Sequence, residues 1–393
     1  MKTLELILIL SFGILFYTYI GYGLICWVLV KLKKQSNIQA LDVEDLPEVT
    51  HIIAAYNEED IIQDKINNCQ LLSYPKEKIR TIIVTDGSSD GTVDIVKNNK
   101  EISLFHKQER SGKLAAVNRV MGEVKSPITI FSDANAMLNV NAIKEMVKHF
   151  QFNTVGGVAG EKVVLSEEED DASAAGEGIY WKYESFLKKL DYKLHSVVGA
   201  AGELFAVRTE LYETPDKDTL IEDFVTTLRI AQKGYRVAYE PNAKAKEYAS
   251  SSLDDELKRK VRISAGGLQA IWMLRTLLNP FKYKMLHFQY VSHRVLRWTL
   301  APLALPVVFI CSFLLAKTGV WYYEVLFGAQ ALFYLAALGG YYFERVKTRF
   351  KIFFIPFYFM FMNLSVYLGL IKLMLGSYSV NWEKANRRVV AQN

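Results

Sequence analysis

The apolar and charged residues of this chain are segregated along its length. Residues 6–30 contain no charged side chain, and a helix rising about 1.5 Å per residue crosses a hydrocarbon core roughly 30 Å thick within such a stretch. Lys31, Lys33 and Lys34 follow directly, and basic residues beside a span favour the cytoplasmic side. A secretory signal would have a shorter apolar core and a cleavage site of small residues. The pattern predicts an N-terminal transmembrane anchor.

A second apolar region begins near residue 300. It contains three candidate spans, residues 300–316, 321–343 and 352–375, which are rich in the Tyr, Trp and Phe common at membrane interfaces. Basic residues between the last two spans predict a cytoplasmic connection, whereas a third full crossing would place the basic tail outside. Either the last segment, which contains Pro356, does not cross fully, or the tail is external. The basic residues concerned are Arg345, Lys347, Arg349 and Lys351 in the connection and Lys384, Arg387 and Arg388 in the tail.

The region between the apolar parts has the pattern of a soluble domain, in which short β-rich runs alternate with helical periodicity. This alternation predicts a mostly parallel sheet covered by helices. The expected strands are residues 49–55, 80–84, 102–105, 128–131 and 155–159, and the expected helices are residues 61–72, 92–98, 113–120 and 140–150.

Between this domain and the last spans, residues 267–278 and 281–298 alternate apolar with basic residues, as do helices that lie along a membrane surface. The chain is therefore expected to have five parts. They are a transmembrane anchor (1–34), a cytoplasmic domain (40–265), interfacial amphipathic helices (266–298), C-terminal transmembrane helices (299–376) and a basic tail (377–393).

Composition narrows the class of protein. The 393 residues are 51% hydrophobic, which excludes a disordered chain. The 47 Lys and Arg against 42 Asp and Glu leave a net charge of only +5, which argues against a dedicated nucleic-acid binder. Cys26, Cys69 and Cys311 are too far apart for a CxxC metal site or a disulfide framework, which favours a reducing compartment. The acidic run at residues 167–171 is typical of a solvated loop rather than a metal site.

The candidate site residues come directly after the expected strands, where ligands bind in a parallel sheet. The loop at residues 86–92, with sequence DGSSDGT, suits a turn followed by a helix cap. It also suits nucleotide binding, in which Asp86 accepts hydrogen bonds from imide and hydroxyl donors. The loop lacks the Gly-Lys-Ser/Thr ending of a Walker loop and the spacing of a dinucleotide loop, so ATP hydrolysis and hydride transfer lose support.

The next loop carries Asp133 and Asn135, two residues apart. In an extended segment both side chains point the same way and could share a hard cation with a diphosphate, although an Asx turn would use the same residues. Lys113 follows Gly112 just before an expected helix. It could carry a positive charge to a phosphate or nucleobase, or remain solvated.

Together these motifs, in this order, resemble the family 2 glycosyltransferases, in particular the membrane-integrated branch that includes the cellulose, chitin and hyaluronan synthases. Residues 53–58 (IAAYNE) are similar to the opening motif, with Ala54 in place of the usual Pro. Residues 85–92 are similar to the uridine-binding loop, and residues 111–118 to the Gly-Lys segment that follows it. Asp133, Ala134 and Asn135 stand where the family has D-x-D, with Asn135 in place of the second carboxylate.

Further along, residues 199–203 (GAAGE) occupy the place of the acceptor-side loop, and residues 221–223 (IED) that of the T-E-D motif. Residues 294–298 (RVLRW) resemble the Q/R-x-x-R-W signature, whose Arg294, Arg297 and Trp298 would share one side of a helix. An interfacial helix whose Arg and Trp face lipid headgroups would have the same pattern. The resemblance covers about residues 1–300.

The resemblance implies an α/β fold: a glycosyltransferase A-type, Rossmann-like and mostly parallel cytoplasmic domain, with interfacial helices and a transmembrane helix bundle. It also implies a role for each matching residue. Asp223 would be the general base, oriented by Glu222. The implied donor-binding residues are Ala55, Tyr56, Glu58, Asp86, Lys113, Asp133, Ala134, Arg294 and Arg297; the acceptor-binding residues are Gly202, Glu203 and Trp298; and the ligands of Mg²⁺ or Mn²⁺ are Asp133 and Asn135.

The expected activity is inverting sugar transfer from a UDP-sugar donor to a growing polysaccharide or a lipid-linked glycan. It would take place at the plasma (inner) membrane, with the catalytic domain in the cytoplasm and the lipid bilayer, but no nucleic acid, as a partner. Transfer of a single sugar to a membrane lipid, as by the ceramide glucosyltransferases, is an alternative that Arg294 leaves open, because polymerising members more often have Gln there. A nucleotide-sugar-sensing membrane protein without activity is an alternative of another class.

Overall fold

The computed structural model describes the chain except residues 34–44, 166–171, 249, 251, 347–350 and 377–393. The predictions made for Lys34, the acidic run at 167–171, Lys347 and Arg349, and the basic tail lie outside the described residues.

Eight strands form one mixed sheet in the order β3-β2-β1-β4-β7-β6-β8-β5. The pairs β1–β2, β2–β3, β1–β4 and β6–β8 are parallel, whereas β7 and β5 run antiparallel to their neighbours. The mostly parallel sheet is confirmed; β5, β7 and β8 were not expected. The strands are β1 (Val49–Ala55), β2 (Ile79–Asp86), β3 (Ser103–Lys107), β4 (Ile128–Asp133), β5 (Met137–Leu138), β6 (Val155–Leu165), β7 (Leu204–Arg208) and β8 (Arg236–Tyr248).

Helices cover the sheet on both faces, as the alternation of β-rich and helical patterns predicts. Every residue of β1 is buried, because a central parallel strand packs against helices on each side. The helices that pack on the sheet are α3 (Glu59–Gln70), α4 (Thr92–Lys97), α5 (Lys113–Met121), α6 (Ala142–Val147) and α8 (Glu222–Gln232). The helix expected at 140–150 is shorter as an α-helix, because its last turn, Lys148–Gln151, is 3₁₀.

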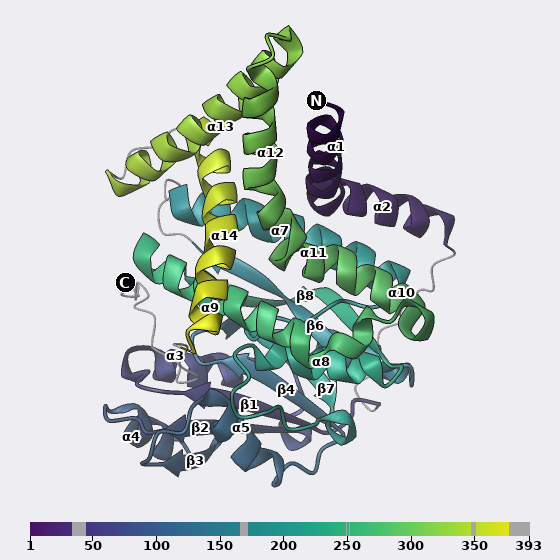
Figure 1. Cartoon of the computed structure of the whole chain (residues 1–393). Helices are drawn as coiled ribbons and strands as arrows, with labels where there is room; N and C mark the ends of the chain where they lie inside the picture. Colours follow the sequence, from purple (N-terminus) through teal and green to yellow (C-terminus); the bar gives the residue numbers. More distant parts are fainter. Residues whose placement is uncertain (34–44, 166–171, 249, 251, 347–350, 377–393) are drawn as a thin grey trace.

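A layer of further helices lies between the sheet and the apolar helices (Figure 1). It contains α7 (Ala172–Leu194), α9 (Leu253–Met273), α10 (Pro280–Tyr290) and α11 (Leu296–Trp298). The helix expected at 267–278 is the last third of α9 followed by a 3₁₀ turn. The domain boundary expected at residue 265 therefore falls inside a continuous helix, because α9 packs one face on the sheet domain and another on the apolar helices.

The apolar helices are α1 (Lys2–Phe16), which continues through a π-helical turn into α2 (Tyr22–Leu32), then α12 (Leu300–Ala316), α13 (Trp321–Arg345) and α14 (Lys351–Met374). Within the described residues, three helices are long and apolar enough to cross a membrane: Lys2–Leu32, Trp321–Arg345 and Ile352–Met374. The segments 280–298 and 300–316 pass the same test only together, with a bend of 52° between them. Several apolar helices thus indicate membrane association.

Helix α14 differs from the expectation of an interrupted span. Pro356 lies inside it, near its start, and the helix continues to Met374. It packs along α9, where Ser264 and Ser365 share a hydrogen bond of 3.1 Å. A Cβ atom at Gly369 would lie 2.8 Å from the backbone nitrogen of Ala265. This close crossing holds α14 over the sheet-side layer.

Candidate active site

The strands β1, β2 and β4 end at the same edge of the sheet. Ala54 of β1 lies in register with Val84 of β2 and with Asp133 of β4. The loops that follow these strands therefore begin side by side. They carry Glu58 after β1, Asp86 at the end of β2 and Asp133 at the end of β4.

A cluster of charged side chains is centred on Lys113, the first residue of α5. Its ammonium group lies 2.7 Å from Oδ1 of Asp133 and 3.1 Å from Oε1 of Glu222. A Cβ atom built at Gly202 would lie 3.4 Å from both Nζ of Lys113 and Oδ2 of Asp223. The fold thus brings together residues from β4, α5, α8 and the loop before β7 that sequence analysis had named separately.

The two adjacent acids at the start of α8 differ in protonation. Burial, together with the neighbouring carboxylate of Glu222, raises the pKa of Asp223 to about 7. Burial acts in the same direction on Glu222, but the charges of Lys113 and Arg262 outweigh it and lower the pKa of Glu222. Glu222 is therefore ionised at neutral pH, whereas Asp223 titrates there, which is the range in which a carboxylate serves as a general base.

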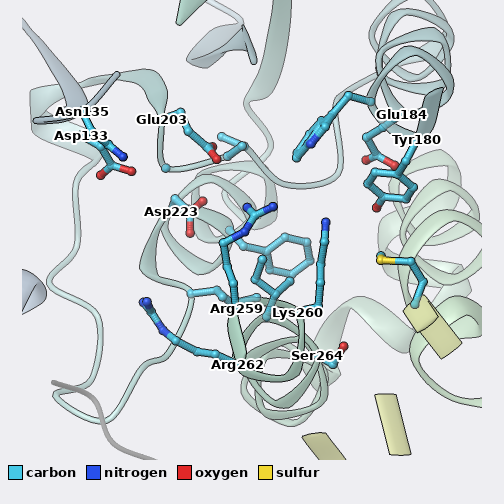
Figure 2. Close-up of a pocket in the computed structure, with 18 of the residues that line it drawn as sticks. Asp133, Asn135, Tyr180, Glu184, Glu203, Asp223, Arg259, Lys260, Arg262 and Ser264 are labelled. Carbon is cyan, nitrogen blue, oxygen red and sulfur yellow. The ribbon is translucent and has the colours of Figure 1, made fainter. Parts of the chain in front are cut away.

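The cluster faces a cavity of about 1470 Å³. Figure 2 shows Asp133 and Asn135 on one side of it, Tyr180 and Glu184 on the opposite side, and Asp223 between them. Beyond Asp223 the walls come from α7, α9 and α14, so one continuous space joins the sheet edge to the apolar helices. A cavity of this size accommodates a large ligand or two smaller ones.

Glu203, expected at an acceptor site, lines the same cavity but is tied to a lysine. Its Oε1 accepts a hydrogen bond of 2.6 Å from Lys162 of β6. Burial opposes ionisation of Glu203, but Lys162 outweighs burial and lowers the pKa of Glu203 to about 2. Lys162 also pairs with Glu247. Glu203 thus contributes an ionised, fixed carboxylate to the cavity wall.

Asp86 lies apart from this cluster. Its Oδ2 accepts hydrogen bonds from the backbone amides of Ser111 (2.7 Å) and Gly112 (2.6 Å). Arg119 lies 3.3 Å from its Oδ1. Asp86 therefore connects β2 to the loop before α5, a structural role that the sequence had not indicated.

Asp86 also lines a separate small pocket of about 10 Å³, together with Ala55 and Tyr56. The guanidinium carbon of Arg110 lies 3.8 Å from the Tyr56 ring centroid. Lys113 lines both this pocket and the large cavity. The three acids therefore do not all face one space. Asp133 and Asp223 line the large cavity, Asp86 lines the small pocket, and Lys113 lies between the cavity and the pocket.

The two expected metal ligands lie on the same side of the cavity (Figure 2). Asp133 and Asn135 line the cavity, whereas Ala134 between them is fully buried in the core and lines neither pocket. No group of three or more His, Cys, Asp or Glu that could hold a metal ion occurs in the part of the chain that is described. One carboxylate and one amide oxygen fit Mg²⁺ or Mn²⁺ when substrate phosphates and water complete the octahedron.

The RVLRW segment meets an acid that sequence analysis did not name. Arg294 lies 2.5 Å from Oε1 of Glu184 on α7, and Arg297 lies 3.2 Å from Oε2 of the same carboxylate. Trp298 packs edge-on against Phe224 of α8, with ring centroids 5.4 Å apart. All three residues of the motif line the large cavity, so the expected common side is realised although the preceding turn is π-helical.

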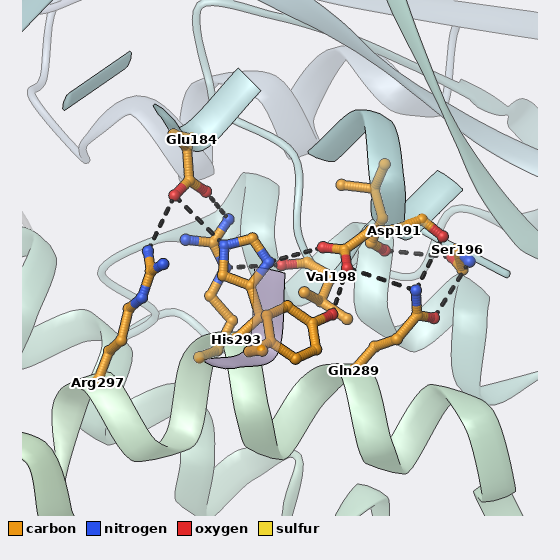
Figure 3. A network of polar contacts seen from close by, with 10 residues as sticks. Glu184, Asp191, Ser196, Val198, Gln289, His293 and Arg297 are labelled. Carbon is orange, nitrogen blue, oxygen red and sulfur yellow. Dashed lines mark hydrogen bonds and ion pairs between the residues drawn. The ribbon is translucent and has the colours of Figure 1, made fainter. Parts of the chain in front are cut away.

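The same acid belongs to a buried polar network (Figure 3). His293 shares hydrogen bonds with Asp191 (2.6 Å) and Glu184 (3.3 Å). Tyr22 of the N-terminal apolar helix donates to Asp191, and Gln289 donates to the Asp191 backbone carbonyl at 2.8 Å. Glu184 and Asp191 lie seven residues apart on α7, a spacing that places two acids on one helix face. This spacing is the feature of the sequence from which the buried pair of acids could have been predicted.

Comparisons with known proteins identify a family and relatives that this chain is similar to. Residues 50–214 match the family Glycosyl transferase family 2. Poly-beta-1,6-N-acetyl-D-glucosamine synthase of Staphylococcus aureus (strain MSSA476) is 27% identical over 255 residues, which cover 62% of this chain and 60% of the relative. The Staphylococcus epidermidis protein of that name is 24% identical over 302 residues, covering 74% of this chain and 70% of the relative. The chain thus matches about three fifths of the length of the S. aureus relative.

A solved structure shares the fold. The mannosyltransferase PcManGT from Pyrobaculum calidifontis, in complex with GDP-Man and Mn2+, superposes with a TM-score of 0.73 at 22% identity. The superposition covers 95% of this chain and all of the other. The glycosyltransferase A-type fold with appended apolar helices is therefore confirmed.

Proposed function

Since this chain is a family 2 glycosyltransferase, we propose that it transfers a sugar from a UDP-sugar to a growing polysaccharide or a lipid-linked glycan at the membrane, with inversion at the anomeric carbon. The observation that carries the proposal is the position of Asp223. Its carboxylate lies beside the Lys113, Asp133 and Glu222 cluster, in a cavity that continues to the apolar helices.

Asp223 is proposed as the general base. As the acceptor hydroxyl oxygen attacks the anomeric carbon, its proton passes to the Asp223 carboxylate, and the bond from that carbon to the diphosphate oxygen breaks. A pKa of about 7 allows Asp223 to be ionised before the reaction and to hold the proton afterwards. Glu222, fixed by Lys113, supplies the negative charge that keeps Asp223 basic.

The leaving diphosphate gains negative charge, which cationic groups at the cavity would stabilise. Lys113 is the candidate nearest to Asp133 and Asp223. Arg294 and Arg297 are held by Glu184 at the cavity wall and have a fixed geometry rather than free rotation. Mg²⁺ or Mn²⁺, when bound by Asp133 and Asn135, would neutralise the diphosphate as a Lewis acid.

Tyr56 and Asp86 are proposed to border the nucleoside. The small pocket that they line adjoins the large cavity through Lys113. Arg110, which lies over the Tyr56 ring, would have to move for a base to stack there. The name of the S. aureus relative supports UDP-N-acetylglucosamine as the first donor to examine.

A cytoplasmic position of the sheet domain, at the plasma (inner) membrane, is proposed from charge. Lys31 and Lys33 end the first apolar helix, and basic residues favour the cytoplasmic side. Lys372 near the end of α14 lines the same cavity as Asp60 and Asp64 of α3. The end of α14 on the sheet side supports a cytoplasmic tail.

The test measures UDP release by the full chain, purified in detergent, with a panel of UDP-sugars and Mn²⁺ or Mg²⁺. Asp223→Asn is expected to lower the rate by at least about 10²-fold, because a general base contributes that much or more. Asp94→Asn, an exposed acid on α4 outside the cavity lining, serves as the control and should leave the rate unchanged.

Mass spectrometry of the products separates the alternatives. A long glycan supports polymerisation, whereas a single added sugar supports transfer to a membrane lipid, which the continuity of the cavity with α14 also favours. Absence of UDP release with every donor would contradict the enzyme and favour a nucleotide-sugar-sensing protein.

A further inference from the structure

The cavity wall formed by β6, α7 and α9 concentrates lysines around one indole ring. The ammonium groups of Lys162, Lys188 and Lys260 lie 5.1, 5.3 and 6.0 Å from the Trp181 ring centroid. Each lysine is almost completely buried, with 3%, 2% and 3% of its surface exposed. Burying an ammonium group costs free energy unless an anion compensates its charge. A buried lysine without a carboxylate partner therefore indicates a place where an anionic ligand could bind.

Two of the three lysines have carboxylate partners. Lys162 pairs with Glu203 and Glu247. Lys260 lies 3.4 Å from Oε1 of Glu256, one turn earlier on α9. Their charges are therefore largely compensated within the protein.

Lys188 is different. It lines the large cavity, and no carboxylate of the described residues lies within 4.0 Å of its ammonium group. Burial lowers its pKa, although Glu184 at longer range opposes this. Lys188 is thus a buried basic group at the cavity wall that, among the described residues, has no carboxylate in ion-pair contact.

An apolar wall lies next to Lys260, which shares the Trp181 ring with Lys188. Lys260 lies 5.0 Å from the Tyr180 ring centroid and 5.9 Å from that of Tyr358 on α14, and the two tyrosine rings are 6.2 Å apart. Phe354, Phe359, Met362 and Val366 of α14 continue the lining of the cavity. Since α14 is long and apolar enough to cross a membrane, this wall suits a hydrocarbon chain.

We propose that Lys188 binds the phosphate of a lipid-linked acceptor, whose hydrocarbon chain lies against α14 and whose head extends past Trp181 towards Asp223. The proposal rests on the proposed function, since it names the acceptor of that reaction. A lysine ammonium is a compact point charge that binds phosphate. An acidic glycan could also pair with the Lys188 ammonium group, but it has no hydrocarbon chain to pack against the phenylalanines and methionine of α14.

Binding is measured by isothermal titration calorimetry on the full chain in a neutral polyoxyethylene detergent, without donor. The probe is dodecyl phosphate, and dodecyl maltoside and a glucuronate oligosaccharide are the comparison ligands. The wild-type chain should bind dodecyl phosphate. Lys188→Met should weaken this binding by about tenfold or more, as expected for loss of a charged hydrogen bond. Lys189→Met, the exposed neighbour on α7, should bind as the wild type does.

Three results would overturn the proposal: equal binding by Lys188→Met and wild type, equal affinity of the wild type for dodecyl phosphate and dodecyl maltoside, or binding of the glucuronate oligosaccharide alone. The comparison of probes uses only the wild-type chain, so it remains decisive if Lys188→Met does not fold. Because no donor is present, a chain that releases no UDP can still bind the probe, which separates failure of this proposal from failure of the proposed function.

Discussion

At the scale of single residues, the protonation of Asp223 makes a prediction about pH. The base must be ionised to accept a proton, and burial with Glu222 raises the pKa of Asp223 to about 7. We expect kcat/KM for sugar transfer to rise with pH, by about tenfold per unit well below pH 7, and to level off above it. The measurement is UDP release across a pH series at fixed ionic strength.

The Asp94→Asn variant should give the same profile as the wild type, because Asp94 is exposed on α4. A rate that stays constant from well below to well above pH 7 would argue that another group accepts the proton.

Glu184 shows what a single residue can add to a motif. Its two oxygens meet Arg294 and Arg297, and burial, which would raise its pKa, is outweighed by Arg294 and His293, which lower it well below its usual range. The arginines of the RVLRW segment are thus held in place by an acid from α7, so their positions depend on how α7 packs against α11 and the π-helical turn before it.

At the scale of elements, the crossing of α9 and α11 makes a second prediction. A Cβ atom at Gly267 of α9 would lie 2.5 Å from the Trp298 ring. Alanine normally stabilises a helix interior by about 1 kcal/mol relative to glycine. Here we expect the opposite sign, because overpacking costs about 1–3 kcal/mol. Gly267→Ala should lower the melting temperature and raise KM for the acceptor, since Trp298 must move.

The control is Gly328→Ala, in the interior of α13, where a Cβ atom would meet nothing within 4 Å. It should leave KM near the wild-type value and should not lower the melting temperature, because alanine there improves helix propensity without a clash. An equal melting temperature for Gly267→Ala would mean that Trp298 does not occupy this contact.

At the scale of the whole molecule, the arrangement of apolar helices makes a prediction about sidedness. The three native cysteines are buried, so introduced cysteines can be labelled selectively. Lys97 on α4 and Lys317 after α12 are both exposed. If α12 and the preceding bent segment cross the bilayer, Lys97→Cys should react with an impermeant maleimide only in inverted vesicles, and Lys317→Cys only in intact cells. Labelling of both from the same side would contradict this topology.

Much of the fold could be predicted from local patterns. The expected strand at residues 49–55 matches β1, and the helices that begin at Thr92 and Lys113 begin as expected. These segments have clear apolar periodicity and turn residues at their ends, so neighbouring residues decide their structure. β7 and β8 were missed because their place in the sheet depends on strands that are distant in the chain: β7 pairs antiparallel with β4 and β6, and β8 pairs parallel with β6.

The candidate site could be predicted in part. The acids after β1, β2 and β4 were found because parallel strands direct their carboxyl ends to one edge. Ala134 stays a predicted donor-binding residue; it is buried in the core, whereas Asp133 and Asn135 on either side of it line the cavity. The separation of Asp86 could not be predicted, since it depends on backbone amides of another loop.

The sequence by itself determined the apolar helices, the mostly parallel sheet and the set of residues at its edge, because periodicity and turn chemistry act between neighbours in the chain. Only the tertiary structure decided which charges meet. Arg297 and Glu184 lie 113 residues apart in the chain, and Lys113 lies between Asp133 and Glu222 only after β4 and α8 have packed. Ion pairs between distant segments depend on geometry at the scale of an ångström, which no local pattern carries.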